Sequence, residues 1–157
     1  MNNFQVGKKL LGEAEEYYEE MLRAYERGSW NVVVRKAQEV VELSLKGLLK
    51  IMGVEYPKEH DVGDVFAQAC GEKRIGIEPE TLEQVRRISA ELARERAPAF
   101  YMDRLYSEEQ ALEAKEAVGR VLETVRGLRD RLGQKSTKKW RPDDGRENQK
   151  NGNQCCR

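Results

Sequence analysis

The chain has 157 residues, 39% hydrophobic and 36% charged, which is enough apolar material for one domain with sharply separated faces. Its 28 basic and 28 acidic residues cancel, which disfavours a nucleic-acid binder that is basic throughout and an acidic disordered chain. The sequence has no apolar run of the roughly 20 residues that span a bilayer, no signal-peptide pattern, and no disulfide or zinc spacing among its cysteines. We therefore expect a cytoplasmic protein without membrane contact.

Hydrophobic periodicity predicts two long helices in the first third of the chain. The first spans about 6–27, and one of its faces carries Leu10, Ala14, Tyr17, Met21 and Tyr25. Gly28 is expected to end it, and Ser29 is placed to cap the second helix. The second helix spans about 30–52 before Gly53, and its broad apolar stripe predicts a central helix that packs on two sides.

Two shorter helices are predicted after a loop that contains Pro57, because proline keeps the residue before it out of helical angles. Asp61 is placed to cap the first of them, over about 62–70. Pro79 suits the first turn of the next helix, and Pro98 is expected to break it.

A capping box predicts the start of the last helix, since Ser107 is followed three residues later by Gln110. Apolar positions continue to Leu132, and Gly133 is expected to end the helix. Neither strand alternation nor an internal repeat is present. The sequence therefore predicts an all-α fold, an antiparallel up-down bundle of four to five helices over 1–133.

Residues 134–157 differ in composition from the rest of the chain. They carry seven Lys/Arg and three Asp/Glu, and Trp140 and two cysteines are almost their only apolar side chains. Such a segment buries too little surface to offset its ordering entropy, so we expect a disordered basic tail. The tail is either a solvated appendage or a tether for nucleic acid or an acidic partner. Cys155 and Cys156 are expected to be exposed free thiols.

Few residues carry recognisable chemistry. His60 is the only histidine, and together with Asp61 and Asp64 it lacks a fourth ligand for zinc, so we expect no metal and no cofactor. No glycine-rich phosphate loop is present, and Cys70 is expected in the core. We interpret His60 as hydrogen bonded to the loop backbone, with a role as general base as the alternative.

Charged residues interrupt the apolar stripe of the second helix. Glu42 and Lys46 are four residues apart in the favourable order, which indicates either a surface ion pair or the charged edge of a cleft. Further along, Arg94, Arg96 and Tyr101 surround the predicted break at Pro98. Arginines beside an aromatic ring suit the binding of phosphates and bases, although the helix dipole also explains Arg96.

Several motifs follow one another in an informative order. They are Trp30, Ala37, the segment 41–49, Gly53, Pro57, and the segments 60–62, 96–101 and 106–111. In this order and spacing they resemble the HEPN domain family (higher eukaryotes and prokaryotes nucleotide-binding), over most of residues 1–132. The resemblance implies an up-down helical bundle, usually a homodimer, that commonly pairs with a minimal nucleotidyltransferase. The broad stripe of the second helix also favours a homodimer.

One branch of this family supplies the toxin of toxin–antitoxin pairs and cleaves RNA without a metal, through an Arg followed four to six residues later by a His. Here Arg96 is followed by Tyr101, and a phenol that ordinarily loses its proton at about pH 10 is a poor general base. The resemblance therefore implies no catalytic residues, and a nucleotide-binding module or a partner subunit of a nucleotidyltransferase. The expected ligand-binding residues are Glu42, Lys46, His60, Arg96 and Tyr101. One alternative is an atypical metal-independent ribonuclease that uses Arg96, Tyr101 and His60, and the other is a purely structural interaction bundle.

Overall fold

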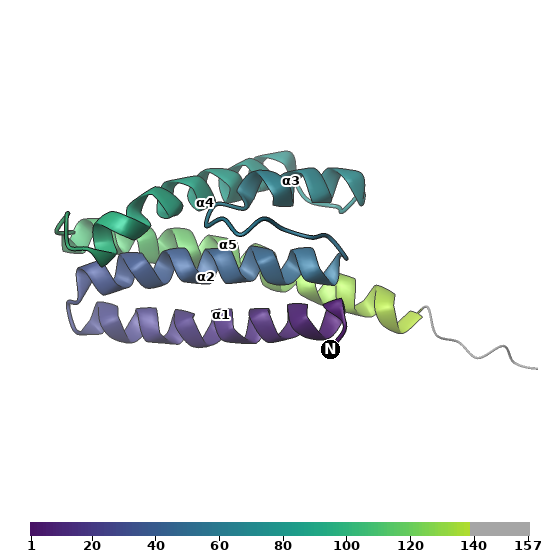
Figure 1. Cartoon of the computed structure of the whole chain (residues 1–157), viewed down its shortest axis with the longest axis horizontal. Coiled ribbons are helices and arrows are strands. Elements are labelled where there is room, and N and C mark those ends of the chain that lie inside the picture. Colours follow the sequence, from purple (N-terminus) through teal and green to yellow (C-terminus); the bar gives the residue numbers. More distant parts are fainter. Residues whose placement is uncertain (139–157) are drawn as a thin grey trace, which may run out of the picture.

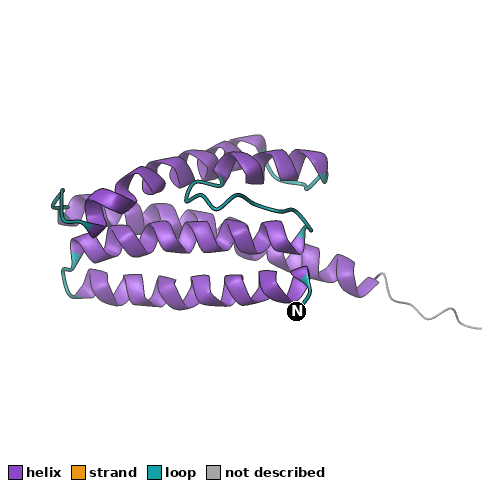
Figure 2. Ribbon diagram, viewed as in Figure 1, coloured by secondary structure: helices purple, strands orange, loops and turns teal. Residues whose placement is uncertain are grey.

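Five α-helices and no strand make up residues 1–138, the part of the chain that this computed structural model describes. The helices are α1 (Asn3–Glu26), α2 (Trp30–Ile51), α3 (Gly63–Glu72), α4 (Pro79–Phe100) and α5 (Glu108–Lys138). The long helices α1, α2, α4 and α5 run in alternate directions along the bundle, and α3 lies beside α4 (Figure 1, Figure 2). The predicted all-α up-down bundle is confirmed. Within residues 1–138, no helix has both the length and the apolar character needed to cross a bilayer.

Helix α2 is the centre of the bundle and packs against α1, α4 and α5. Its fully buried aliphatic and small side chains are Val33, Val34, Ala37, Val40, Val41, Leu45, Leu48 and Leu49. These side chains point to more than one side of the helix, so the predicted packing on two sides is confirmed. Burying one such aliphatic side chain stabilises the fold by about 1.5–3 kcal/mol, which makes α2 the main apolar contributor to the core.

Glycines set the distance between α1 and α2. A Cβ atom added to Gly7 would lie 2.6 Å from the backbone oxygen of Gly47 and 2.7 Å from Cγ1 of Ile51. A Cβ atom added to Gly47 would lie 2.8 Å from a methyl group of Leu11. Because a backbone atom blocks Gly7, a larger side chain there would require the two helices to move apart.

The capping box at the start of α5 is confirmed. The Ser107 hydroxyl accepts a hydrogen bond from the Gln110 N–H at 3.2 Å, and the Gln110 side chain accepts one from the Ser107 N–H at 2.9 Å. The same reciprocal motif joins Asn2 and Gln5, and it starts α1 three residues earlier than predicted. Ser29 occupies the cap position of α2, but the prediction that its side chain caps the helix is wrong.

The left-handed backbone at Gly28 (φ 73°) and Gly53 (φ 72°) ends α1 and α2, as predicted. The predicted break at Pro98 is wrong, because α4 continues to Phe100. Proline lacks only one donor there, and its own carbonyl accepts the N–H of Asp103 at 3.1 Å, so the last turn is still tied down.

The predicted end of α5 at Gly133 is also wrong, since the helix continues to Lys138. A glycine inside a helix costs only about 1 kcal/mol relative to alanine, and good helix formers flank this one. The helix therefore includes the first five residues of the predicted tail. The remaining 139–157 lie outside the described residues, so the expected disorder and the two terminal cysteines stay predictions.

The glycine contact between α1 and α2 leads to a test with an internal control. Gly7→Ala is expected to lower the free energy of unfolding by about 1–2 kcal/mol, because the strain of overpacking exceeds the gain in helix propensity. Gly12→Ala, on the same helix with no atom near its new Cβ, is expected to raise it by up to about 1 kcal/mol. Urea unfolding measures both, and equal effects of the two changes would contradict the close approach.

Candidate functional site

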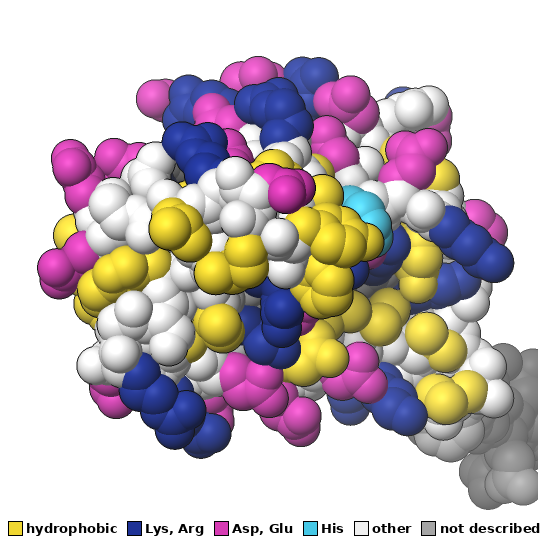
Figure 3. Space-filling view, turned by 60° about the vertical axis from the view of Figure 1, so that its left-hand side comes forward, with side chains coloured by type: hydrophobic (Ala, Val, Ile, Leu, Met, Phe, Trp, Pro, Cys, Tyr) yellow, Lys and Arg dark blue, Asp and Glu magenta, His cyan; other side chains and the backbone are white. Residues whose placement is uncertain are grey.

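A cleft of about 490 Å³ between α2 and α4, here called the α2–α4 cleft, collects several of the predicted site residues. Its lining residues are Arg35, Glu39, His60, Ala93, Arg96, Ala97, Phe100 and Tyr101. The histidine lies at the surface beside hydrophobic side chains (Figure 3). The cleft therefore combines cationic groups with aromatic rings on one exposed face.

The Glu42 carboxylate lies behind this cleft and joins its parts. One of its oxygens accepts a hydrogen bond from Lys46 Nζ at 2.7 Å, and the other accepts one from Gln38 Nε2 at 2.8 Å. His60 Nδ1 lies 3.0 Å from the second oxygen, and Arg96 Nη1 lies 3.7 Å from it. The predicted ion pair of Glu42 and Lys46 therefore forms, but it is largely buried, because the two side chains are only 14% and 12% exposed.

Two opposing effects act on the pKa of Glu42. Burial raises the pKa, and the hydrogen bonds from Lys46, Gln38 and His60 lower it. The hydrogen bonds prevail, so the pKa lies below its ordinary value and the carboxylate is charged at neutral pH. A charged carboxylate accepts hydrogen bonds at both oxygens more strongly than a neutral acid, so Glu42 acts as a charged hub that orients these donors more firmly.

The amide of Gln38 connects the hub to the cleft wall. Its oxygen accepts a hydrogen bond from Arg96 Nη1 at 2.7 Å while its nitrogen donates to Glu42. Gln38 is 2% exposed, so both of its polar ends must be satisfied inside the protein. The guanidinium of Arg96 is thereby held in one orientation at the edge of the cleft.

The His60 side chain contacts the side chain of Glu42 and not the backbone of its own loop. The interpretation that His60 is hydrogen bonded to the loop backbone is therefore wrong. An imidazole and a guanidinium far apart in sequence, His60 and Arg96, therefore share one carboxylate and line one cleft. The spacing of Arg96 and Tyr101 along the chain gave no indication of this.

Arg35 brings an uncompensated positive charge to the same cleft. Its Nε atom is buried without a hydrogen-bond partner, and within residues 1–138 its guanidinium has no acidic partner. The guanidinium lies over the ring of Phe100, 5.1 Å from the ring centroid, and Phe100 contacts the ring of Tyr101 edge-on. A cation that is oriented but unpaired is suited to bind an anion.

The five predicted ligand-binding residues thus divide into two groups. His60, Arg96 and Tyr101 line the cleft, whereas Glu42 and Lys46 lie behind it. Sequence reasoning missed Arg35 and Phe100 as lining residues, and it missed Gln38 as the connecting amide. A signal for Gln38 was available, because it lies on the buried side of α2 four residues before Glu42.

The loop that carries His60 is anchored by Asp61. The Asp61 carboxylate accepts the N–H of Gly63 at 3.0 Å and the hydroxyl of Ser89, on α4, at 2.7 Å. Asp61 therefore bonds the N–H of Gly63, the first residue of α3, and ties the loop to α4, but Val62 occupies the cap position, so the prediction that Asp61 is the cap residue is wrong. Asp64 pairs with Arg86, and the described residues contain no cluster of three or more His, Cys, Asp or Glu side chains suited to a metal ion.

Cys70 is buried in the core, as predicted, and its thiol is not suited to act as a nucleophile. Burial raises the pKa of its thiol to about 11, so the thiolate needed for nucleophilic attack is scarce at neutral pH. The α2–α4 cleft, which collects His60, Arg96 and Tyr101, is therefore the candidate functional site.

Comparison with known proteins assigns the family. The HEPN domain profile matches residues 8–128, most of the chain. The chain belongs to the HEPN domain family. The crystal structure of an archaeal HEPN homologue has the same fold, with a TM-score of 0.59 at 21% identity, over 78% of this chain and 97% of that one. No curated protein matches the chain.

The role of Glu42 as a charged hub leads to a pH-dependent prediction. Because its folded pKa lies below the unfolded value of 4.5, its contribution to stability is complete above 4.5 and is lost as the pH falls through the folded pKa. Glu42→Gln is expected to lower the free energy of unfolding by about 1–3 kcal/mol at neutral pH. The difference from the unmodified protein is expected to shrink in acid.

Urea unfolding at a series of pH values measures this difference. The matched control is Glu59→Gln, in the same loop as His60, where the structure shows no hydrogen bond or ion pair within residues 1–138. A loss of stability in Glu42→Gln that stays constant with pH would show that packing and not charge is responsible.

Proposed function

We propose that this HEPN domain is a non-catalytic nucleotide-binding module whose ligand occupies the α2–α4 cleft. The observation that carries the proposal is the unpaired guanidinium of Arg35 beside the exposed rings of Phe100 and Tyr101. A phosphate group supplies the missing anionic partner of Arg35, and a base can stack on an exposed ring. The family's name and the cleft's composition support the same class of ligand.

The chain is better equipped to bind a phosphate than to cleave one. Metal-independent cleavage of RNA needs a base for the 2′-hydroxyl and an acid for the leaving oxygen. One chain supplies a single imidazole, His60, and the nearby amine of Lys46 is engaged with Glu42. Binding therefore requires only groups that the cleft presents, whereas cleavage requires a second proton-transfer group.

Nucleotide binding is tested by calorimetric titration with ATP, AMP and adenosine. Arg35→Ala is expected to weaken binding of the phosphorylated ligands by about tenfold or more, because a charge-assisted hydrogen bond is lost. The control Arg87→Ala removes an exposed arginine of α4 that does not line the cleft and is expected to leave the affinity unchanged. The absence of heat at millimolar concentrations, or equal affinities for Arg35→Ala and the unmodified protein, would refute the proposal.

A metal-independent ribonuclease is the second candidate, and one observation favours it. His60 and Arg96 meet at Glu42, so an imidazole oriented by a carboxylate lies in the same cleft as a guanidinium. That arrangement suits a general base beside a phosphate-binding group. A homodimer, which remains a proposal, would bring two such imidazoles into one assembly.

Incubation of RNA with the purified protein in the presence of a chelator distinguishes the two candidates. If the ribonuclease candidate is right, cleavage occurs, and His60→Ala lowers its rate by about 100-fold or more. Arg96→Lys keeps the charge but loses the bond to Gln38, and it is expected to slow cleavage as well. If the binding module is right, RNA stays intact with every variant, including the Arg87→Ala control.

A partner protein is a separate part of the proposal. The corner between α4 and α5 exposes four large apolar side chains, Phe100, Tyr101, Met102 and Leu105, each more than half exposed. Hydrophobic side chains gather on the face at this end of the bundle (Figure 3). Contiguous exposed apolar groups are typical of a protein interface, which supports a protein partner at this corner. We propose a nucleotidyltransferase, in a toxin–antitoxin-like pair, as that partner.

A further inference from the structure

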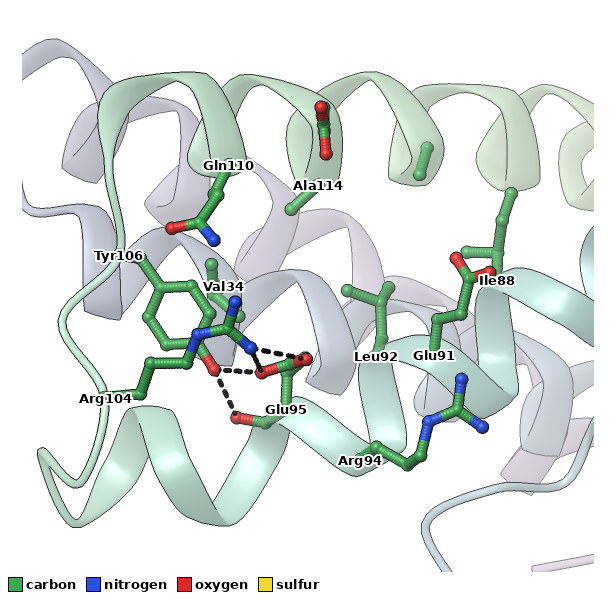
Figure 4. A pocket seen from close by; sticks show the side chains of 12 residues that line it. Val34, Ile88, Glu91, Leu92, Arg94, Glu95, Arg104, Tyr106, Gln110 and Ala114 are labelled. Atoms are coloured by element: carbon green, nitrogen blue, oxygen red, sulfur yellow. Dashed lines mark hydrogen bonds and ion pairs between the residues drawn. The ribbon is translucent and has the colours of Figure 1, made fainter.

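A second cleft, of about 290 Å³, lies between α4 and α5 and shares no lining residue with the α2–α4 cleft. We call it the α4–α5 cleft. Its apolar lining consists of Val34, Ile88, Leu92, Ala114 and Ala117. Side chains from α4 and α5 form its two walls, with α2 behind them (Figure 4). The space corresponds to about ten water-sized groups, the volume of a small organic molecule.

Small residues explain why this space stays open. Ala114 and Ala117 are three residues apart on α5, so they lie on one face of the helix. Opposite them stand the larger Ile88 and Leu92 of α4. Leucine at either alanine position would fill the gap, whereas alanine leaves a hollow whose apolar lining is mostly buried.

One end of the cleft is closed by polar side chains that form hydrogen bonds and an ion pair with one another. The Tyr106 hydroxyl donates to the Glu95 carboxylate, which Arg104 also contacts at 3.2 and 3.3 Å (Figure 4). Burial, and then the neighbouring carboxylate of Glu95, raises the pKa of Tyr106 to about 12, so the phenol stays protonated and keeps donating. The charge of Glu95 is therefore compensated, and this end forms a fixed wall.

The mouth of the cleft carries charges that are not compensated. Glu91 lies on the α4 wall (Figure 4). Glu113 belongs to α5 and lines the same cleft. Among the described residues neither carboxylate has an ion pair or a side-chain hydrogen bond, and the same holds for Arg94. Two unpaired carboxylates against one unpaired guanidinium leave an excess of one negative charge over an apolar lining.

We propose that the α4–α5 cleft binds a small organic cation. Its apolar body lies against Leu92, Ala114 and Ala117, and its ammonium or guanidinium group lies between Glu91 and Glu113. Ligand sites are typically concave and combine apolar groups with polar groups that set the orientation, and this cleft combines five apolar lining residues with seven polar or charged ones. An anion of the same shape has only Arg94 to oppose both glutamates, so the charge balance favours a cation.

Three probes with one shared apolar body test the proposal: 3-phenylpropylamine, 3-phenylpropanol and 3-phenylpropionate. Titration is followed by the backbone amide signals of the protein in two-dimensional nuclear magnetic resonance. The amine is expected to bind about fivefold more tightly than the alcohol, and the carboxylate more weakly than both. The largest shifts are expected at Leu92, Ala114 and Ala117. If no probe binds at about 10 mM, where a ligand of ten heavy atoms should bind, the proposal is overturned.

Variants separate the apolar lining from the charged mouth. Ala117→Leu fills the half-buried edge of the cleft and is expected to abolish binding of the amine and the alcohol. Glu113→Gln is expected to weaken amine binding by about two- to fivefold while leaving the alcohol unchanged. The control Glu116→Gln changes an exposed glutamate of the same helix that does not line the cleft, and it is expected to have no effect.

The opposite results are equally clear. Equal affinities for the amine and the alcohol show that the glutamates do not select the ligand, and they overturn the proposal. A folded Ala117→Leu protein, checked by circular dichroism, that still binds the amine as tightly also overturns it. If Ala117→Leu does not fold, the comparison of Glu113→Gln with Glu116→Gln decides alone.

Discussion

The α2–α4 cleft depends on the hydrogen bonds and ion pairs of the largely buried Glu42 carboxylate. Removing a carboxylate from water is costly, and the cost is recovered only when donors satisfy both oxygens. Lys46 donates a hydrogen bond to one oxygen, and Gln38 and His60 donate to the other. Each donor comes from α2 or from the loop that follows it, so the charge of Glu42 fixes that loop against the central helix. Deleting any single donor leaves the others around an under-satisfied charge, which is why the network acts as a unit.

Among the described residues, this pairing leaves Arg35 in the cleft without an acidic partner. Arg96 is already committed to the Gln38 amide, and Glu39, the carboxylate nearest in the lining, pairs with Lys36 at 3.3 Å. The charged groups that remain available to a ligand are therefore those that no other side chain in the fold already pairs. Arg35 is available because Glu42 and Glu39 are both occupied by other donors.

The fold was largely predictable from local patterns, and the site was not. Periodicity, glycine stops and the Ser107 capping box are local signals, and they placed the helices. Pro98 and Gly133 misled because each imposes only a local penalty: Pro98 removes one donor, and Gly133 costs about 1 kcal/mol relative to alanine. The meeting of His60 with Arg96 and the contact of Gly7 with Gly47 arise from packing between helices, which no spacing along the chain encodes.

One asparagine connects the two clefts at the corner after α4. The Asn31 amide donates to the carbonyls of Ala99 at 3.3 Å and Arg104 at 2.8 Å, and its oxygen accepts the Tyr106 N–H at 3.1 Å. These bonds hold a turn in which Met102 has a left-handed backbone (φ 59°), a conformation that costs a non-glycine residue about 1–2 kcal/mol. The turn places Phe100 at one cleft and Arg104 and Tyr106 at the other. The geometry of both clefts therefore depends on α2, which supplies Asn31 to the corner as it supplies Glu42 to the hub.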